Sequence, residues 1–194
     1  LRAGADKVVV NSGAFKKKEL IKKISDKYGS QCVTLSIDAK LDKKFSSNYK
    51  IMIENGKIET NCDLLDWVKY GVKQGAGEIL LNSVEHDGGK KGYNLELIKL
   101  VSSNVKVPTI AMGGVGIWKH FLEGIKIGKA QSVAAGNIFH YTEHSTKKAK
   151  EYLIKSGIQM RPTYFYGLNS IYFRFCSGFR VSCNVPWVDA STVL

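Results

Sequence analysis

Residues 107–116 (VPTIAMGGVG) and 131–141 (QSVAAGNIFHY) decide how the fold of this chain is interpreted. Each segment begins as an apolar strand and ends in small residues where a helix is expected to start. Glycine lets the backbone approach a ligand closely, and the free N–H groups at a helix N-terminus favour an anion. Two such turns in succession are typical of the phosphate site that follows strands 7 and 8 of a (β/α)8 barrel. The sequence therefore predicts a phosphorylated small-molecule substrate.

Five strand-like runs alternate with amphipathic helices along the chain. The runs are almost continuously apolar, as expected for parallel strands that are buried on both faces. They lie at residues 7–11, 32–38, 78–82, 107–112 and 132–135, and the helices at 16–28, 63–74, 95–101 after an Asn94 cap, 118–128 and 146–156. Right-handed crossovers leave two folds open, a doubly wound sheet and part of a barrel.

A longer interval separates the second strand from its helix. Residues 49–60 (YKIMIENGKIET) alternate between apolar and polar, and Asn55-Gly56 lies between the two halves. Asn-Gly in this setting is a strong hairpin signal. We predict an inserted β-hairpin on the side of the barrel where catalytic loops lie.

The length and the two ends of the chain indicate a partial barrel. The 194 residues are fewer than the about 250 that are typical of a complete (β/α)8 barrel. The chain starts at Leu1 with a segment that reads like the end of a helix, so we expect an N-terminal truncation and a barrel segment over residues 1–162. Exposed sheet edges would make such a chain oligomeric or poorly soluble. Residues 163–194 are rich in aromatic residues and lack lysine, and we expect them not to belong to the fold.

Charge and cysteine content argue against several classes of function. The formal net charge is +12, but the lysines fall mostly within helical patterns and no aromatic-and-basic platform accompanies them, so no nucleic acid is expected. The four cysteines show neither CxxC spacing nor a ligand cluster, so we expect no metal, and Cys32 is predicted to be a buried strand thiol. No run approaches the ~18 apolar residues of a membrane span, which predicts a cytoplasmic protein without membrane contact.

Two segments carry side chains suited to chemistry. Asp38 ends the second strand, where a carboxylate is placed for general acid–base catalysis, with a loop or helix cap as the alternative. The loop at 82–94 (NSVEHDGGKKGYN) carries Glu85, His86 and Asp87 and suits a segment that closes over a substrate. An acidic turn or a metal site are the alternatives for this loop, and the metal site is disfavoured because no ligand elsewhere joins it.

Seven motifs occur in the order and approximate spacing of one family. They are AGADKV (3–8), GSQC (29–32), IDAK (37–40), GAGEILL (75–81), DG with KGY (87–88 and 91–93), GG (113–114) and IFH (138–140). In this order, residues 1–162 closely resemble the cyclase subunit of imidazole glycerol phosphate synthase, from histidine biosynthesis. The resemblance implies a (β/α)8 barrel of which this chain holds strands 4–8, their helices and the inserted hairpin.

The resemblance also implies an activity and a partner. The family is a lyase that receives ammonia from a glutaminase subunit and uses no cofactor. It cleaves and cyclises a bis-phosphorylated formimino-carboxamide ribonucleotide, which gives imidazole glycerol phosphate and an aminoimidazole carboxamide ribonucleotide.

Site residues follow from the same resemblance. Asp38 matches one of two catalytic aspartates, a general acid/base, and Glu85 and Asp87 fall in a loop that lines the site. Asn11 and Ser12 match the binding site for one substrate phosphate. The site for the other phosphate is matched by Gly113, Gly114, Gly136 and Asn137. The charged residues around the ammonia entrance are matched by Lys7 and Glu78, with Gln31 nearby.

Departures from the family pattern open alternatives. The first three strands and the second catalytic aspartate are missing, and one carboxylate cannot divide acid and base roles, so the chain as given is expected to be inactive. Met112 stands where serine is more usual, and the loop reads Glu85-His86-Asp87 instead of Asp-Arg-Asp. With residues 139–143 (FHYTE), these features resemble a paralogous branch of surface-polysaccharide gene clusters that delivers ammonia for sugar amidation. A non-catalytic fragment that docks a glutaminase is the other alternative.

Overall fold

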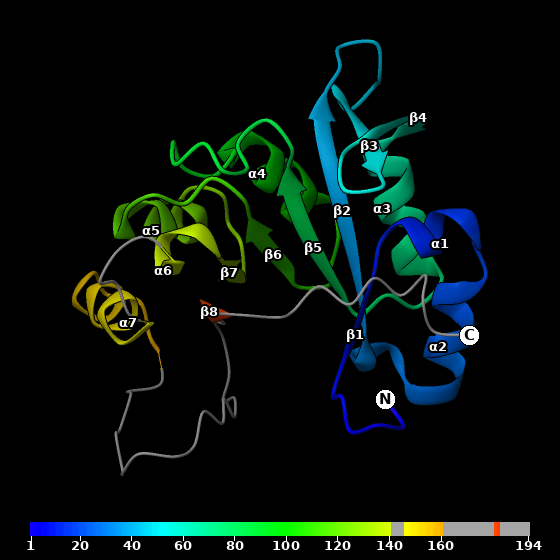
Figure 1. Cartoon of the computed structure of the whole chain (residues 1–194), viewed down its shortest axis with the longest axis horizontal. Helices are drawn as coiled ribbons and strands as arrows, with labels where there is room; N and C mark the ends of the chain where they lie inside the picture. The colour runs from blue at the N-terminus through cyan, green and yellow to red at the C-terminus, as the bar shows by residue number, and fades with distance from the viewer. Residues whose placement is uncertain (141–145, 161–180, 183–194) are drawn as a thin grey trace.

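The computed structural model describes residues 1–140, 146–160 and 181–182, and Figure 1 shows the arrangement of their helices and strands. The strands are β1 (Val8–Val10), β2 (Val33–Leu41), β3 (Tyr49–Ile53), β4 (Ile58–Asp63), β5 (Glu78–Ser83), β6 (Thr109–Met112), β7 (Ser132–Ala134) and β8 (Val181–Ser182). The helices are α1 (Ser12–Lys16), α2 (Leu20–Tyr28), α3 (Leu64–Lys73), α4 (Leu95–Asn104), α5 (Trp118–Lys126), α6 (Asn137–His140) and α7 (Thr146–Lys155), with a short 3₁₀ turn at Ser30–Cys32.

The parallel strands follow one another in the sheet in chain order. The order is β1, β2, β5, β6, β7 and β8, and the strands stand side by side in Figure 1. A doubly wound sheet reverses its strand order at a switch point, which places helices on both faces. Here the order never reverses, so right-handed crossovers place the helices on one face. The predicted partial (β/α)8 barrel is confirmed, and the doubly wound alternative is excluded.

One face of the sheet is apolar and packs against the helices. On β2, Val33, Leu35 and Ile37 are at most 2% exposed. A Cβ added at Gly71 of α3 would lie 2.2 Å from Leu35 Cδ2, so helix and strand touch closely there. This interface is the core of the domain, and its other fully buried side chains include Ile21, Val68, Ile79, Leu97 and Phe121.

The opposite face of the same strands is polar. Successive side chains of a strand point to opposite faces, so Thr34, Ser36 and Asp38 share the face that Leu35 and Ile37 do not occupy. The register pairs Thr34 with Glu78 and Asp38 with Asn82. All five side chains are buried. In a closed barrel this face is the interior, and its carboxyl-terminal end is where catalytic groups lie.

The predicted hairpin is confirmed. Strands β3 and β4 pair antiparallel, and β3 pairs antiparallel with the carboxyl-terminal half of β2. Glu54, Asn55 and Gly56 all have positive φ, between 53° and 76°. Asparagine and glycine accept this conformation readily, which explains why the Asn-Gly signal located the turn.

The predicted helix at 16–28 is wrong in its first part. Helix α1 ends at Lys16, the chain turns at Lys17 (φ −123°, ψ 84°), and α2 begins at Leu20. The break lets each short helix bury its own apolar residue, Ala14 in α1 and Ile21 in α2, both 0% exposed. Cys32 is also not the buried strand thiol that was predicted, because it is half-buried in the 3₁₀ turn before β2.

Most of the segment 163–194 lies outside the described residues. Its described part, Val181–Ser182, pairs in parallel with β7. Within the described ranges, no helix combines the length and the apolar character needed to cross a membrane.

Asp63 lies at the junction of the hairpin and α3. The hydrogen bonds of its carboxylate predict that the stability of the fold depends on pH. Its Oδ1 accepts hydrogen bonds from the N–H groups of Leu65 (2.8 Å) and Asp66 (3.4 Å), and its Oδ2 from Ser47 N (2.9 Å) and Ser46 Oγ (3.0 Å). Burial alone would raise the pKa of Asp63, but these hydrogen bonds outweigh it and hold the pKa below its ordinary value.

A depressed pKa stabilises the fold above the unfolded pKa of about 3.9, and this stabilisation is lost as the pH falls through the folded value. We therefore expect Asp63→Asn to lower the free energy of unfolding by about 1–3 kcal/mol at pH 7, because the amide nitrogen cannot accept the hydrogen bonds that one carboxylate oxygen accepts. The difference from the natural chain should shrink as the pH falls below about 3.9 and through the lower pKa of folded Asp63. Urea unfolding between pH 3 and 7 measures it, and a difference that is the same at every pH would contradict the assignment.

Candidate functional site

Asp38 lies between two asparagine side chains from the neighbouring strands. Asn11 Nδ2 donates to Asp38 Oδ2 (2.9 Å), and Asn82 Nδ2 donates to Asp38 Oδ1 (3.0 Å). Asp38 is 6% exposed and sits in the carboxyl-terminal half of β2. The arrangement presents one carboxylate, held at both oxygens, at the end of the sheet where barrels place their chemistry.

Strand register explains this geometry. Asp38 and Asn82 are Cα partners in the parallel pair of β2 and β5. Asn11 follows β1, which pairs with β2 on the other edge. Three neighbouring strands therefore bring their polar residues to one level of the sheet.

Asn82 was not singled out from the sequence. Strand β5 was predicted to end at Asn82, just as β2 was predicted to end at Asp38. This shared position at the end of a predicted strand was the signal that could have identified Asn82. The register that joins the two residues depends on long-range pairing, which the local sequence pattern does not contain.

The first glycine turn follows β6 and packs tightly against the loop after β5. Gly113 and Gly114 have φ of +89° and +90°. Gly114 accepts a hydrogen bond from this loop, since Gly92 N donates to Gly114 O (2.7 Å). A Cβ at Gly114 would lie 2.3 Å from Gly92 O and 2.9 Å from His86 O. Backbone packing therefore requires glycine at position 114.

The second glycine turn is open. Gly136 is exposed, and a Cβ there would meet nothing within 4 Å. It precedes α6, whose Phe139 N donates to Gly136 O (3.0 Å). Asn137 opens this helix, and its side chain lies outside what the structure describes. Space beside a new helix start is compatible with an anion site.

Ser12 lies at the start of α1, which follows β1. Strand β1 pairs with the edge of β2 opposite the one that pairs with β5. The Oγ of Ser12 accepts a hydrogen bond from the N–H of Glu54 (2.8 Å), so the hairpin turn touches the start of α1. Lys16, one turn further along α1, forms an ion pair with Glu54. The predicted phosphate residues Asn11 and Ser12 are thus adjacent to Asp38 and to the hairpin.

The structure does not bring Glu85 and Asp87 into contact with Asp38. Both side chains are exposed, in a turn where Asp87 N donates to Ser83 O (3.0 Å). Glu85 and His86 instead line a shallow groove with residues of β2, β3 and the start of α4. His86 Nδ1 lies 2.9 Å from Gly92 O, which ties this histidine to its own loop.

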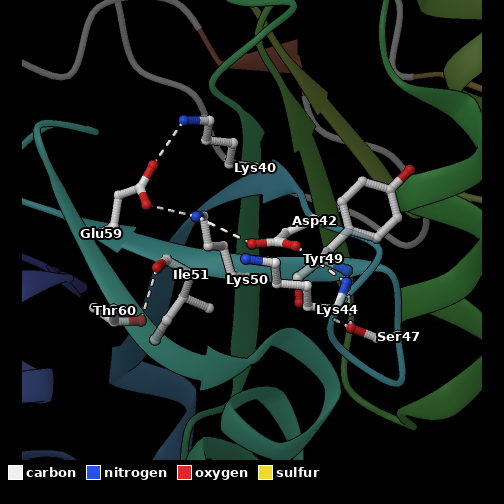
Figure 2. Close-up of polar contacts among 9 residues, drawn as sticks. All are labelled: Lys40, Asp42, Lys44, Ser47, Tyr49, Lys50, Ile51, Glu59 and Thr60. Carbon is white, nitrogen blue, oxygen red and sulfur yellow. Dashed lines mark hydrogen bonds and ion pairs between the residues drawn. The ribbon is translucent and has the colours of Figure 1, made fainter.

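The hairpin carries a network of ion pairs next to the carboxyl-terminal end of β2 (Figure 2). Glu59 accepts from Lys40 (2.8 Å) and from Lys50 (2.6 Å), and Lys50 also pairs with Asp42 (3.2 Å). Hydrogen bonds and charge from the two lysines lower the pKa of Glu59 to about 2. The network fixes the hairpin against β2 two residues beyond Asp38.

Lys7 and Glu78 meet at the opposite end of the strands. Lys7 Nζ lies 2.5 Å from Glu78 Oε1, and Thr34 Oγ1 donates to Glu78 Oε2 (3.1 Å). Gln31 is exposed in the 3₁₀ turn, where its Nε2 donates to Tyr28 O (3.3 Å). The predicted entrance residues Lys7 and Glu78 are therefore together, on the polar face that also carries Asp38.

Removing Lys7 should destabilise the fold, because it removes a cation that pairs with the buried carboxylate of Glu78, which is 7% exposed. We expect Lys7→Met to lower the free energy of unfolding by about 1–3 kcal/mol. Lys22→Met is the matched control, since Lys22 pairs with Asp26 on the surface, where a pair contributes about 0–1 kcal/mol. Equal losses in urea unfolding at pH 7 would refute the buried role of the Lys7–Glu78 pair.

Comparisons with known proteins agree with this architecture. A family model described as "Histidine biosynthesis protein" matches residues 1–145. The HisF subunit of imidazole glycerol phosphate synthase from Bacillus subtilis (strain 168) is 49% identical over 161 residues, which are 83% of this chain and 64% of the relative. The subunit of the same name from Clostridium botulinum (strain 657 / Type Ba4) is 45% identical over 161 residues, which are 83% of this chain and 63% of the relative. The chain thus spans a little less than two thirds of the length of these relatives.

Proposed function

The chain belongs to the family of histidine biosynthesis proteins, and from this premise we propose that it forms the catalytic part of an ammonia-dependent cyclase. The reaction is the cleavage and ring closure of a bis-phosphorylated formimino-carboxamide ribonucleotide. Its products are imidazole glycerol phosphate and an aminoimidazole carboxamide ribonucleotide. The observation that carries the proposal is the Asp38 carboxylate, bonded at both oxygens between Asn11 and Asn82.

Asp38 is the general acid/base of this proposal. The reaction needs protons to be taken from the nitrogen that ammonia supplies and to be given to the leaving nitrogen and to the oxygen that leaves as water. A carboxylate at the carboxyl-terminal end of a barrel strand is placed for that work. The two amides that hold it keep its oxygens in a fixed orientation while protons are transferred.

A substrate with two phosphates fits the order of the strands. Asn11 and Ser12 follow β1, on one side of β2, whereas Gly113 and Gly114 follow β6, beyond β5 on the other side. Gly136 and Asn137 extend the second group after β7. In this proposal each group binds one phosphate, and Asp38 faces the reacting centre between them. Glu85 and Asp87 belong to the loop that would close over the substrate.

A glutaminase subunit is the proposed source of ammonia. The ion pair of Lys7 and Glu78 lies at the end of the strands opposite Asp38, so ammonia would enter there and travel along the polar face. Gln31 is exposed near this end and is a candidate contact for the glutaminase. Ammonium salts should replace the partner in vitro, because the barrel needs only ammonia itself.

The test is ammonia-dependent turnover by the natural protein that carries this sequence. Purified protein is incubated with the bis-phosphorylated ribonucleotide and ammonium chloride, and both products are separated by chromatography. We expect imidazole glycerol phosphate to form in proportion to the ammonium added. Substrate binding without turnover would favour the paralogous branch that delivers ammonia for sugar amidation, to which the Glu85-His86-Asp87 loop points. A protein that binds a glutaminase but neither binds nor converts the ribonucleotide would favour a non-catalytic fragment that docks a glutaminase.

A further inference from the structure

The two amides that hold Asp38 differ in their surroundings. Asn11 is half-buried after β1, whereas Asn82 is 6% exposed within β5. Asn82 is also the register partner of Asp38, so their contact is built into two adjacent strands of the sheet. Of the two, only Asn82 lies within a strand and is a register partner of Asp38.

The orientation of the Asn82 amide is set by the carboxylate. Its Nδ2 donates to Asp38 Oδ1 (3.0 Å), and the reversed amide would place Oδ1 against a carboxylate oxygen. The Asn82 Oδ1 that results is buried and has no hydrogen-bond partner among the residues that the structure describes. A buried polar atom without a partner costs free energy, so the contact with Asp38 is kept at the expense of stability.

Gly113 provides the space for this amide. A Cβ at Gly113 would lie 2.3 Å from Asn82 Oδ1 and 3.5 Å from Ser83 O. The first glycine turn therefore contacts Asp38 indirectly, through one asparagine side chain. If the turn moves when it binds an anion, the Asn82 side chain would shift and change the orientation of the Asp38 carboxylate.

We propose that Asn82 is a positioning residue, which orients the Asp38 carboxylate and couples it to the glycine turn at Gly113. The inference rests on the proposed function, because it assigns Asn82 a part in the reaction of Asp38. Asn82 does not itself touch the reacting atoms. Its effect is exerted through the hydrogen bond to Asp38 Oδ1.

A double-mutant cycle in the full chain tests the contact without any activity. Asn82→Asp places two carboxylates side by side and is expected to raise the unfolding equilibrium constant at pH 7 by about tenfold or more. The swapped variant Asp38→Asn/Asn82→Asp restores one amide and one carboxylate, and should recover most of that loss. Additive effects of the two substitutions would show that the side chains do not interact, and would overturn the proposal.

Kinetics separate positioning from a merely structural role. In the natural protein that carries this sequence, Asn82→Leu is expected to lower kcat by about tenfold or more, a larger change than in KM for the ribonucleotide, because it removes the donor to Asp38 Oδ1. The swapped variant should stay inactive although it is stable, since its carboxylate is displaced onto β5. An Asn82→Leu protein that folds and keeps its full kcat would overturn the proposal.

Thr109→Val is the matched control. Thr109 is 0% exposed, has an Oγ1 that is also buried without a partner among the described residues, and pairs in register with Ile79 of the apolar face. Its substitution removes a buried polar atom of the sheet but no donor to the carboxylate, so kcat should be unchanged. If the natural protein shows no cyclase turnover at all, the proposed function fails, and the double-mutant cycle alone decides whether Asn82 orients Asp38.

Discussion

In the natural protein that carries this sequence, Asp38→Asn is expected to lower ammonia-dependent turnover by about 10²–10⁴-fold, the contribution that general acid–base catalysis typically makes. Asparagine has nearly the same size, so the substitution removes the titratable group and keeps the shape. It also sets an amide N–H against one of the two N–H donors, Asn11 or Asn82, that now bond the carboxylate. The measurement is the initial rate of product formation at saturating ammonium and ribonucleotide.

The control for this substitution is Asp26→Asn. Asp26 lies on α2, is exposed, and pairs with Lys22 one turn away. It has the same chemistry as Asp38 but lies on a surface helix, so turnover should stay within experimental error of the natural protein. Full turnover in Asp38→Asn would remove the assignment of Asp38 as the acid/base.

The second large effect is expected on stability, from Gly114→Ala. The residue has φ +90°, and an added Cβ would lie 2.3 Å from the backbone oxygen of Gly92. The next nearest atom is His86 O, and both are backbone atoms, which cannot turn aside as the end of a side chain can. The loop at 84–92 or the turn itself must therefore move. Strain of this kind and overpacking together predict a loss of about 2–4 kcal/mol in the free energy of unfolding.

Gly136→Ala is the matched comparison, because it separates folding from binding. Gly136 has open space around its Cα, so alanine should change the free energy of unfolding by less than about 0.5 kcal/mol. If the turn binds a substrate phosphate, the same alanine should weaken ribonucleotide affinity. Urea unfolding and calorimetric titration measure the two quantities, and equal stability losses in Gly114→Ala and Gly136→Ala would contradict the packing described for Gly114.

Local patterns predicted the elements better than their contacts. The apolar runs located β1, β2, β5, β6 and β7 but not β8, the Asn55-Gly56 pair located the hairpin, and Asn94 was correctly predicted to cap α4, where it accepts from Leu97 N (3.0 Å). Each of these signals is carried by residues that are close in sequence. The sequence pattern missed the end of α1 at Lys16, because that break depends on how Ala14 and Ile21 reach separate parts of the core.

The candidate site was predictable only in part, for the same reason. Asp38 could be singled out because a carboxylate at the end of an apolar strand is informative by itself. The contact of Asn82 with Asp38 and the packing of the glycine turn against residues 84–92 arise from strand register and loop placement. These are long-range features, and the single sequence carries no direct record of them.

The central claim is that this chain supplies the catalytic Asp38 and the glycine turns of an ammonia-dependent cyclase. The most direct measurement uses a chimera in which the 161 aligned residues of this chain replace their counterparts in the Bacillus subtilis relative. Purified chimera is given the bis-phosphorylated ribonucleotide and ammonium chloride. The account predicts that imidazole glycerol phosphate forms, and that Asp38→Asn in the same chimera abolishes it. A folded chimera that binds the ribonucleotide but forms no product would contradict the account.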